Sequence, residues 1–157
     1  MKIRALIRKL NMFFGRFFSL IILLGCCLSN AFGQTTPQLA AFDACEDSSK
    51  SYSRLAMIVA AEVRKISQLN DGDAKADALK QVMGQVNRLK DSEYVRLDKL
   101  KDDARGEGVR SRLYADTYAL VYMSSFEYAV ALALNNPNQS EIRFKVDIER
   151  DCKKSFR

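Results

Sequence analysis

Apolar residues recur at intervals of three and four along most of the chain after residue 38, a spacing typical of amphipathic helices that face a core. The first such segment covers about 39–69 and ends where Asn-Asp-Gly-Asp at 70–73 supplies turn chemistry. Its apolar stripe comprises Tyr52, Leu55, Ala56, Val59, Val63 and Ile66. The pattern predicts a long first helix.

A second helix is predicted after Asp73, which is a suitable N-terminal cap. Its stripe comprises Ala78, Leu79, Val82, Met83, Val86 and Leu89. The phase of the stripe slips at Asp91-Ser92 before apolar residues resume, which predicts a kink there. Gly-Glu-Gly at 106–108 ends this helix.

The third segment, about 109–135, is the most apolar part of the chain after the leader. Between Tyr118 and Leu134 the only charged residue is Glu127, so nearly every side of this helix must meet protein. We therefore predict that it is the central helix. A membrane span is the alternative, although Glu127 in mid-run argues against it. Asn-Asn-Pro at 135–137 ends the helix, because the residue before proline is disfavoured in the helical region.

The last segment permits two interpretations. Residues 141–149 alternate apolar and charged side chains as a strand does, but the chain offers no partner strand. As a helix capped by Ser140, the same segment places Phe144, Ile148 and Cys152 on one face. We favour the helix. The predicted fold is an all-α bundle of three long helices and a short fourth, forming a single domain over 34–157.

Residues 1–33 have the layout of a secretory signal peptide. Five basic residues and no acidic ones accompany an apolar run over 17–28, and Ala-Phe-Gly at 31–33 provides small residues before a cleavage site. The run is shorter than the roughly 20 residues of a transmembrane helix. We predict cleavage and a periplasmic or secreted protein. The alternatives are an uncleaved membrane anchor, or lipidation of Cys26 in a Leu-Leu-Gly-Cys sequence that resembles a lipoprotein box.

Removal of the leader changes the charge of the protein. The full chain has 25 basic and 19 acidic residues and a net charge of +6. Five of the basic residues lie in the leader, which leaves 20 against 19 and a net charge of +1. The high isoelectric point therefore belongs largely to the leader, and we expect no nucleic-acid partner. A membrane partner is expected only if the leader is retained or Cys26 is lipidated.

Cys45 and Cys152 are the cysteines that remain after cleavage, near opposite ends of the domain. In an oxidising compartment they predict a disulfide. Closing a loop of about 108 residues would contribute roughly 4–5 kcal/mol on a chain-entropy model. Two free thiols are the alternative. Two thiolates without histidine fall short of a structural zinc site, so we expect no metal and no cofactor.

Two features of the third helix could carry chemistry. Tyr114, Tyr118 and Tyr122 form a ladder at intervals of four, which suits stacking on a sugar or a partner helix but more often packs in a core. Glu127 could be an acid catalyst with a raised pKa. The favoured interpretation is a buried carboxylate paired with Arg54 or Arg64.

The exposed charges near 90–105 form a second candidate interaction surface, in which Arg96 and Lys99 are the residues chosen for substitution. Their acidic neighbours lie at helical spacings that stabilise weakly. The chain contains no histidine, which excludes serine–histidine and cysteine–histidine catalysis. We therefore predict that the protein is not an enzyme.

Four features together define the layout of the chain: Cys45, the helix from Leu55 to Arg64, the Tyr-Ala-Leu-Val-Tyr sequence at 118–122 and the closing Cys152. This layout resembles that of small two-cysteine helical proteins exported by Gram-negative bacteria, their plasmids and phages. The resemblance is one of layout and leaves function open. It adds to the expectation of an exported, non-catalytic binding protein with a protein partner in the cell envelope. The alternatives are an inhibitor or immunity-type protein against an envelope hydrolase, and an N-terminally anchored envelope protein.

Overall fold

The structure, a computed structural model, describes residues 35–154. This part of the chain contains four helices and no strand. The helices are α2 (Thr36–Ser67), α3 (Gly72–Arg105), α4 (Val109–Asn135) and α5 (Ser140–Lys154). The predicted all-α bundle of three long helices and a short fourth is confirmed. The predicted signal peptide lies outside the described residues.

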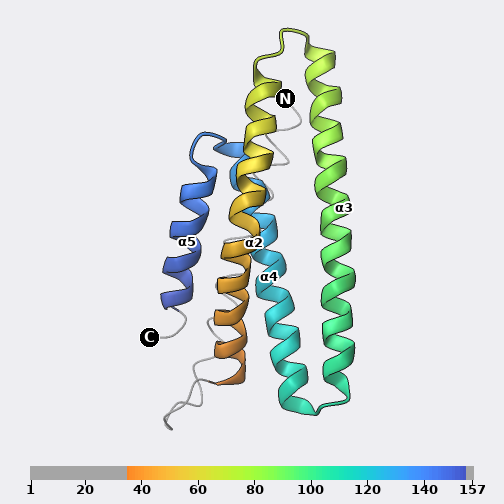
Figure 1. Ribbon diagram of the computed structural model, residues 1–157, viewed down its shortest axis with the longest axis vertical. Helices are drawn as coiled ribbons and strands as arrows, with labels where there is room; N and C mark the ends of the chain where they lie inside the picture. The colour runs from red at the N-terminus through yellow and green to blue at the C-terminus, as the bar shows by residue number, and fades with distance from the viewer. Residues whose placement is uncertain (1–34, 155–157) are drawn as a thin grey trace. The chain divides into compact units, whose positions relative to one another are not determined.

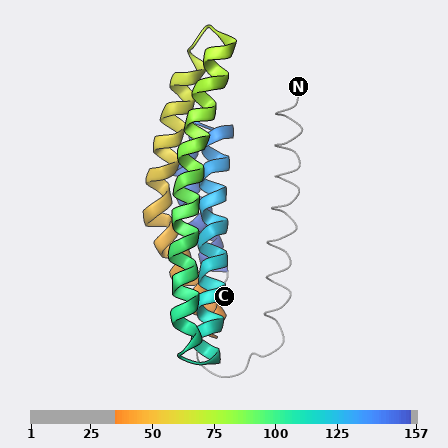
Figure 2. The same cartoon turned by 90° about the vertical axis from the view of Figure 1, so that its right-hand side faces the viewer.

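Short connections reverse the chain after each helix, so α2 and α4 run parallel and form the inner pair (Figure 1). α3 and α5 lie on opposite sides of this pair and do not contact each other. Seen from the side, α3 lies over the seam between α2 and α4 (Figure 2). The prediction that 109–135 is the central helix is confirmed, and α2 shares that position with it.

Small side chains bring α2 and α4 together. The fully buried residues of the two helices include Ala44 on α2 and Ala129 and Ala133 on α4. Alanine leaves room for close approach of two helices, and larger residues fill the remaining space around the contact. The largest fully buried side chains are Phe126, Phe144 and Leu97, which come from three different helices. The core is therefore shared by α3, α4 and α5 around the alanine contact.

α3 is one continuous helix and runs without a sharp bend (Figure 1), so the predicted kink at Asp91-Ser92 is wrong. The apolar stripe of α3 keeps its phase. Glu93 lies between Val86 and Leu97 on the stripe, at a position where the pattern leads us to expect an apolar residue. The Glu93 side chain is largely buried on this face and binds Arg96. A polar residue at a buried position therefore looked like a break in the apolar pattern. α3 is also the most exposed long helix, with only Val86, Leu97 and Ala104 buried.

Two helix starts differ from the sequence prediction. Asp71, and not Asp73, caps α3, because its Oδ1 accepts hydrogen bonds from the backbone N–H groups of Asp73 at 2.8 Å and Ala74 at 3.3 Å. α2 begins at Thr36 and not near 39. Gln38 supports the earlier start, since its Oε1 accepts from the N–H and the hydroxyl of Thr35.

α5 settles the ambiguity of the last segment in favour of the helix. Phe144, Ile148 and Cys152 lie on its buried face, as the spacing of four predicts. Cys152 is disulfide-bonded to Cys45 of α2, with 6.0 Å between the two Cα atoms. The predicted pairing is thus present, and it joins the last helix to the first.

Candidate interaction surface

The tyrosine ladder of α4 is packed inside the bundle. Tyr118 and Tyr122 are only 8% and 5% exposed, and Tyr114 is partly buried. Successive rings stack at centroid distances of 6.1 Å from Tyr114 to Tyr118 and 5.6 Å from Tyr118 to Tyr122. Tyr52 of α2 packs against the end of the ladder, 4.8 Å from the ring of Tyr122. The ring faces are therefore occupied by protein, which supports core packing over sugar stacking.

Aspartates of α2 accept the hydroxyl hydrogens of this ladder. Tyr114 donates to Asp43 and Tyr118 to Asp47, both at 2.6 Å and both across 71 residues of sequence. Burial and the hydrogen bond to Asp43 raise the pKa of Tyr114 to about 12. Burial and the hydrogen bond to Asp47 likewise raise the pKa of Tyr118. The two bonds fix the register of the parallel helices.

Arg96 connects α3 to the ladder. Its guanidinium carbon lies 4.8 Å from the ring centroid of Tyr122, within the range of a cation–π contact. Its Nε donates to Glu93 at 3.0 Å. Burial is the largest single influence and lowers the pKa of Arg96. The hydrogen bond to Glu93 and the attraction of Glu93 and the nearby tyrosines together outweigh burial, so the pKa is raised. Arg96 is thus part of the packing between α3 and α4 as well as a surface charge.

Lys99 does not join this cluster. Its side chain is 75% exposed and its ammonium lies 2.7 Å from Oδ2 of Asp103, one turn further along α3. The structure therefore brings together Arg96 and the tyrosines among the predicted site residues, and places Lys99 apart from them. Lys99 is the cleaner probe of the α3 surface, since no core residue depends on it.

The predicted charge pairs of α3 are present. Glu93 binds Arg96 and Asp103 binds Lys99, while Lys101 lies 2.6 Å from Asp98. Pairs of this spacing on an exposed helix contribute only a few tenths of a kcal/mol each. These pairs stabilise α3 only weakly, and their main effect is to fix the positions of the charged groups along the helix.

Glu127 pairs with Lys90 of α3, at 2.6 Å, so the predicted pairing with Arg54 or Arg64 is wrong. Glu127 lies on the side of α4 that faces α3, whereas both arginines belong to α2. Arg64 instead donates to the carbonyl oxygen of Pro137, and Arg54 is exposed. The hydrogen bond to Glu127 raises the pKa of Lys90. The Glu127 side chain is 39% exposed, so the prediction that it is a buried carboxylate is also wrong.

Two leucines of α4 are exposed, Leu113 at 46% and Leu120 at 47%. Thr117 donates its hydroxyl to the carbonyl of Leu113, and Ser124 donates to that of Leu120, each at 2.9 Å, so both hydroxyls are turned onto the helix backbone. The exposed Asp116, 3.9 Å from Arg112, lies between the two leucines along the helix, so this surface is mixed in character.

Within residues 35–154, α4 is the one helix long and apolar enough to cross a membrane. Just over half of its most apolar stretch is buried in the bundle, at 56%. A buried core helix passes the same test of length and hydropathy, so the composition of α4 agrees with its central position.

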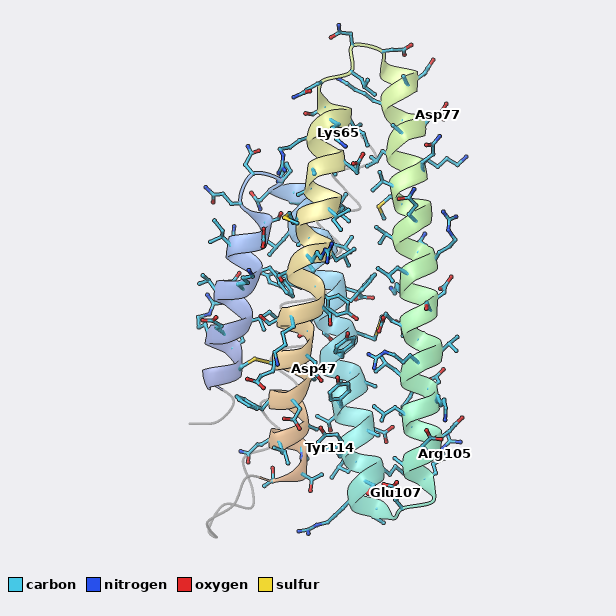
Figure 3. All side chains as sticks on the ribbon, viewed as in Figure 1. Asp47, Lys65, Asp77, Arg105, Glu107 and Tyr114 are labelled. Carbon is cyan, nitrogen blue, oxygen red and sulfur yellow. A yellow bond between two sulfur atoms is a disulfide. The ribbon has the colours of Figure 1, made fainter. Side chains whose placement is uncertain are left out.

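A shallow cavity of about 390 Å³ lies near the turn between α3 and α4. It is lined by Leu100, Asp103, Glu107, Arg110 and Tyr114, among others, and Figure 3 shows Glu107 and Tyr114 at this end of the bundle. In the described part of the chain no group of three or more potential ligands is placed to hold a metal ion.

The interacting residues that the sequence analysis missed include Asp43, Asp47 and Lys90. The sequence did contain one indication of the two aspartates. They are four residues apart, and so are Tyr114 and Tyr118. Two parallel helices with matched spacings place such pairs opposite each other. Lys90 carried no comparable signal, since charged residues surround it along α3.

No protein-family model, no curated protein and no solved structure matches this chain. The layout resemblance to exported two-cysteine helical proteins therefore stays a prediction from the sequence. The assignment that rests on direct observation is a four-helix, all-α protein in which Cys45 and Cys152 join the first and last described helices.

Proposed function

We propose that the protein is an exported, non-catalytic binding protein of the bacterial cell envelope, found in the periplasm or secreted. The observation that carries the proposal is the disulfide between Cys45 and Cys152, which joins α2 to α5 across 107 residues of sequence. Such bonds persist in oxidising compartments and are rare in reducing ones. The signal-peptide layout of residues 1–33 supports the same compartment.

The surface that we assign to binding is the half of α3 around Arg96 and Lys99. Its charges are held in order by pairs within the helix, and Arg96 is anchored on Tyr122. Val95 stands out of this surface, 72% exposed, between the charged residues. An ordered row of both signs of charge suits a protein partner with a complementary mixed-charge surface, because such complementarity selects partners and speeds association.

The intact mass of the exported protein tests the compartment. We expect a chain that starts at Gln34, lighter by two hydrogens, with two thiols alkylated only after reduction. A full-length chain, a lipid-modified one or free thiols from the outset would refute a soluble, disulfide-closed exported form.

The binding surface is tested with a photo-crosslinking residue at position 95 in the exported protein. Lys99→Glu should reduce the yield of the crosslinked partner several-fold, because the charge at the centre of the surface is reversed. Lys80→Glu is the matched control, since Lys80 is also exposed on α3 but lies outside 90–105. Equal yields in both variants and the wild type would contradict the assignment. A partner that proves to be an envelope hydrolase, inhibited on binding, would identify the inhibitor alternative.

A further inference from the structure

α5 is the shortest helix of the described bundle. It contacts α2 and α4 but not α3. Phe144 and Ile148 are its large buried side chains, and both project from one face. A helix of 15 residues is marginal in water without such packing. The stability of α5 therefore depends on what holds it against α2 and α4.

Contacts hold α5 near its start, its middle and its end. At its start, Ser140 donates its hydroxyl to the carbonyl of Ala56 at 3.3 Å. In its middle, Asp147 accepts the hydroxyl hydrogen of Tyr128. Near its end, the bond from Cys152 to Cys45 is the covalent attachment, in the last turn of the helix. Loss of that bond frees the end of α5 that is remote from its connection to α4.

The other three helices keep their mutual contacts without α5. Asp43 and Asp47 of α2 bind the tyrosines of α4, and Arg96 and Lys90 join α3 to α4. None of these residues belongs to α5. The bundle of α2, α3 and α4 thus has its own set of hydrogen bonds, ring contacts and ion pairs, and the release of α5 leaves that set unbroken.

We propose that the Cys45–Cys152 disulfide is a redox-controlled clasp, and that its reduction releases α5 while the bundle of α2, α3 and α4 stays folded. The reductant is a dithiol of the oxidoreductase class. One of its thiolates attacks a sulfur of the clasp, its second thiol resolves the mixed disulfide, and two electrons and two protons pass to Cys45 and Cys152. The dithiol leaves as a disulfide.

Release of α5 uncovers a strip of α2 and α4. The strip includes Cys45 and Ala56 of α2 and Tyr128 of α4, whose ring lies 6.2 Å from that of Phe144. Both cysteines are more than nine-tenths buried, so attack on the clasp follows a local opening of the last turn of α5. Reduction therefore converts a closed surface into an open one lined by small and aromatic side chains.

Hydrogen exchange of the exported protein, oxidised and then reduced with dithiothreitol, tests this inference. We expect amides over 141–152 to exchange at least tenfold faster after reduction, while those of α3 and the middle of α4 keep their protection. Unchanged protection in α5 would show that the clasp is not needed to hold the helix. An equal loss of protection in α3 and α4 would show that reduction unfolds the whole bundle. Either result overturns the proposal.

Two matched substitutions in α5 separate release from general destabilisation. Ile148 is 7% exposed and Ile142 is 72% exposed, and both belong to the same helix. Ile148→Ala should speed reduction of the disulfide severalfold, because it weakens the docked face and so increases local opening. Ile142→Ala should leave the rate near that of the wild type. Equal rates in the two variants would show that reduction does not proceed through the release of α5.

Discussion

Single residues in this protein act mainly as connectors between helices. Tyr114 and Tyr118 of α4 each bind an aspartate of α2, and Arg96 of α3 lies over the ring of Tyr122 of α4. Glu127 and Lys90 do the same for α3 and α4, but their side chains stay 39% and 31% exposed. Water reaches this pair and weakens the attraction between its charges.

We therefore expect Glu127→Gln to lower the free energy of unfolding by no more than about 1 kcal/mol. Urea denaturation measures this change. Glu62→Gln is the matched control, because it removes the carboxylate from an exposed pair with Lys65. A loss above about 3 kcal/mol for Glu127→Gln would indicate a desolvated ion pair instead.

At the scale of the helices, small side chains determine where a helix begins and how closely two helices pack. Asp71 satisfies two backbone donors at the start of α3, whereas Asp73 lies in its first turn. The contact between α2 and α4 depends on alanines that allow close approach, and Ala129 is fully buried there. Neither feature involves a large side chain, yet each determines where a helix begins or how near it lies to its neighbour.

Asp71→Ala should cost about 1 kcal/mol of stability, because two N–H groups of α3 lose their acceptor. Asp73→Ala should cost less, about 0.3–1 kcal/mol, since it removes only a favourable charge from the first turn. Thermal unfolding of the two variants compares them directly. A larger loss of stability for Asp73→Ala than for Asp71→Ala would show that Asp73 is the cap, as the sequence predicted.

Ala129→Leu should destabilise the protein by about 1–3 kcal/mol, because the added atoms push α4 away from α2. Ala131→Leu adds the same atoms on a partly exposed side of α4 and should cost little. Denaturant midpoints of the two variants measure the difference. Equal destabilisation would mean that the α2–α4 contact tolerates expansion.

At the scale of the whole molecule, three tyrosine–aspartate bonds join the helices of the described chain, besides the core and the disulfide. Two of these bonds join α2 to α4, and the third joins Tyr128 of α4 to Asp147 of α5. Burial and the bond to Asp147 raise the pKa of Tyr128 to about 12, as the bond to Asp43 does with burial for Tyr114. The folded state therefore retains phenol protons that the unfolded chain releases near pH 10.

A raised tyrosine pKa contributes stability that is fully present below about pH 10 and is lost as the pH rises toward 12. We expect the free energy of unfolding to fall across this window, as measured by urea denaturation at fixed pH. In the double variant Tyr114→Phe/Tyr128→Phe the stability at neutral pH should be lower and the fall from pH 10 to 12 shallower. Parallel curves for the variant and the wild type would contradict this account.

Much of the fold followed from local patterns. The stripe over 109–135, the turns at 70–73 and 106–108 and the spacing of Phe144, Ile148 and Cys152 each depend on neighbouring residues only. The apparent kink at Asp91-Ser92 misled because Glu93 takes a position in the helix contact that usually holds an apolar residue. Whether a charged side chain turns toward a contact depends on the partner helix, which periodicity does not reveal.

The sequence by itself determined three long helices and their order, because helix formation follows local periodicity. It favoured a fourth helix over a strand and a disulfide over free thiols, since two cysteines allow a single pairing within the domain. Only the tertiary structure decided that Glu127 pairs with Lys90, and that the tyrosines of α4 face aspartates of α2. Those contacts depend on the rotation and register of each helix against its neighbour. Side-chain packing over the whole core sets both quantities, so no single stretch of sequence contains them.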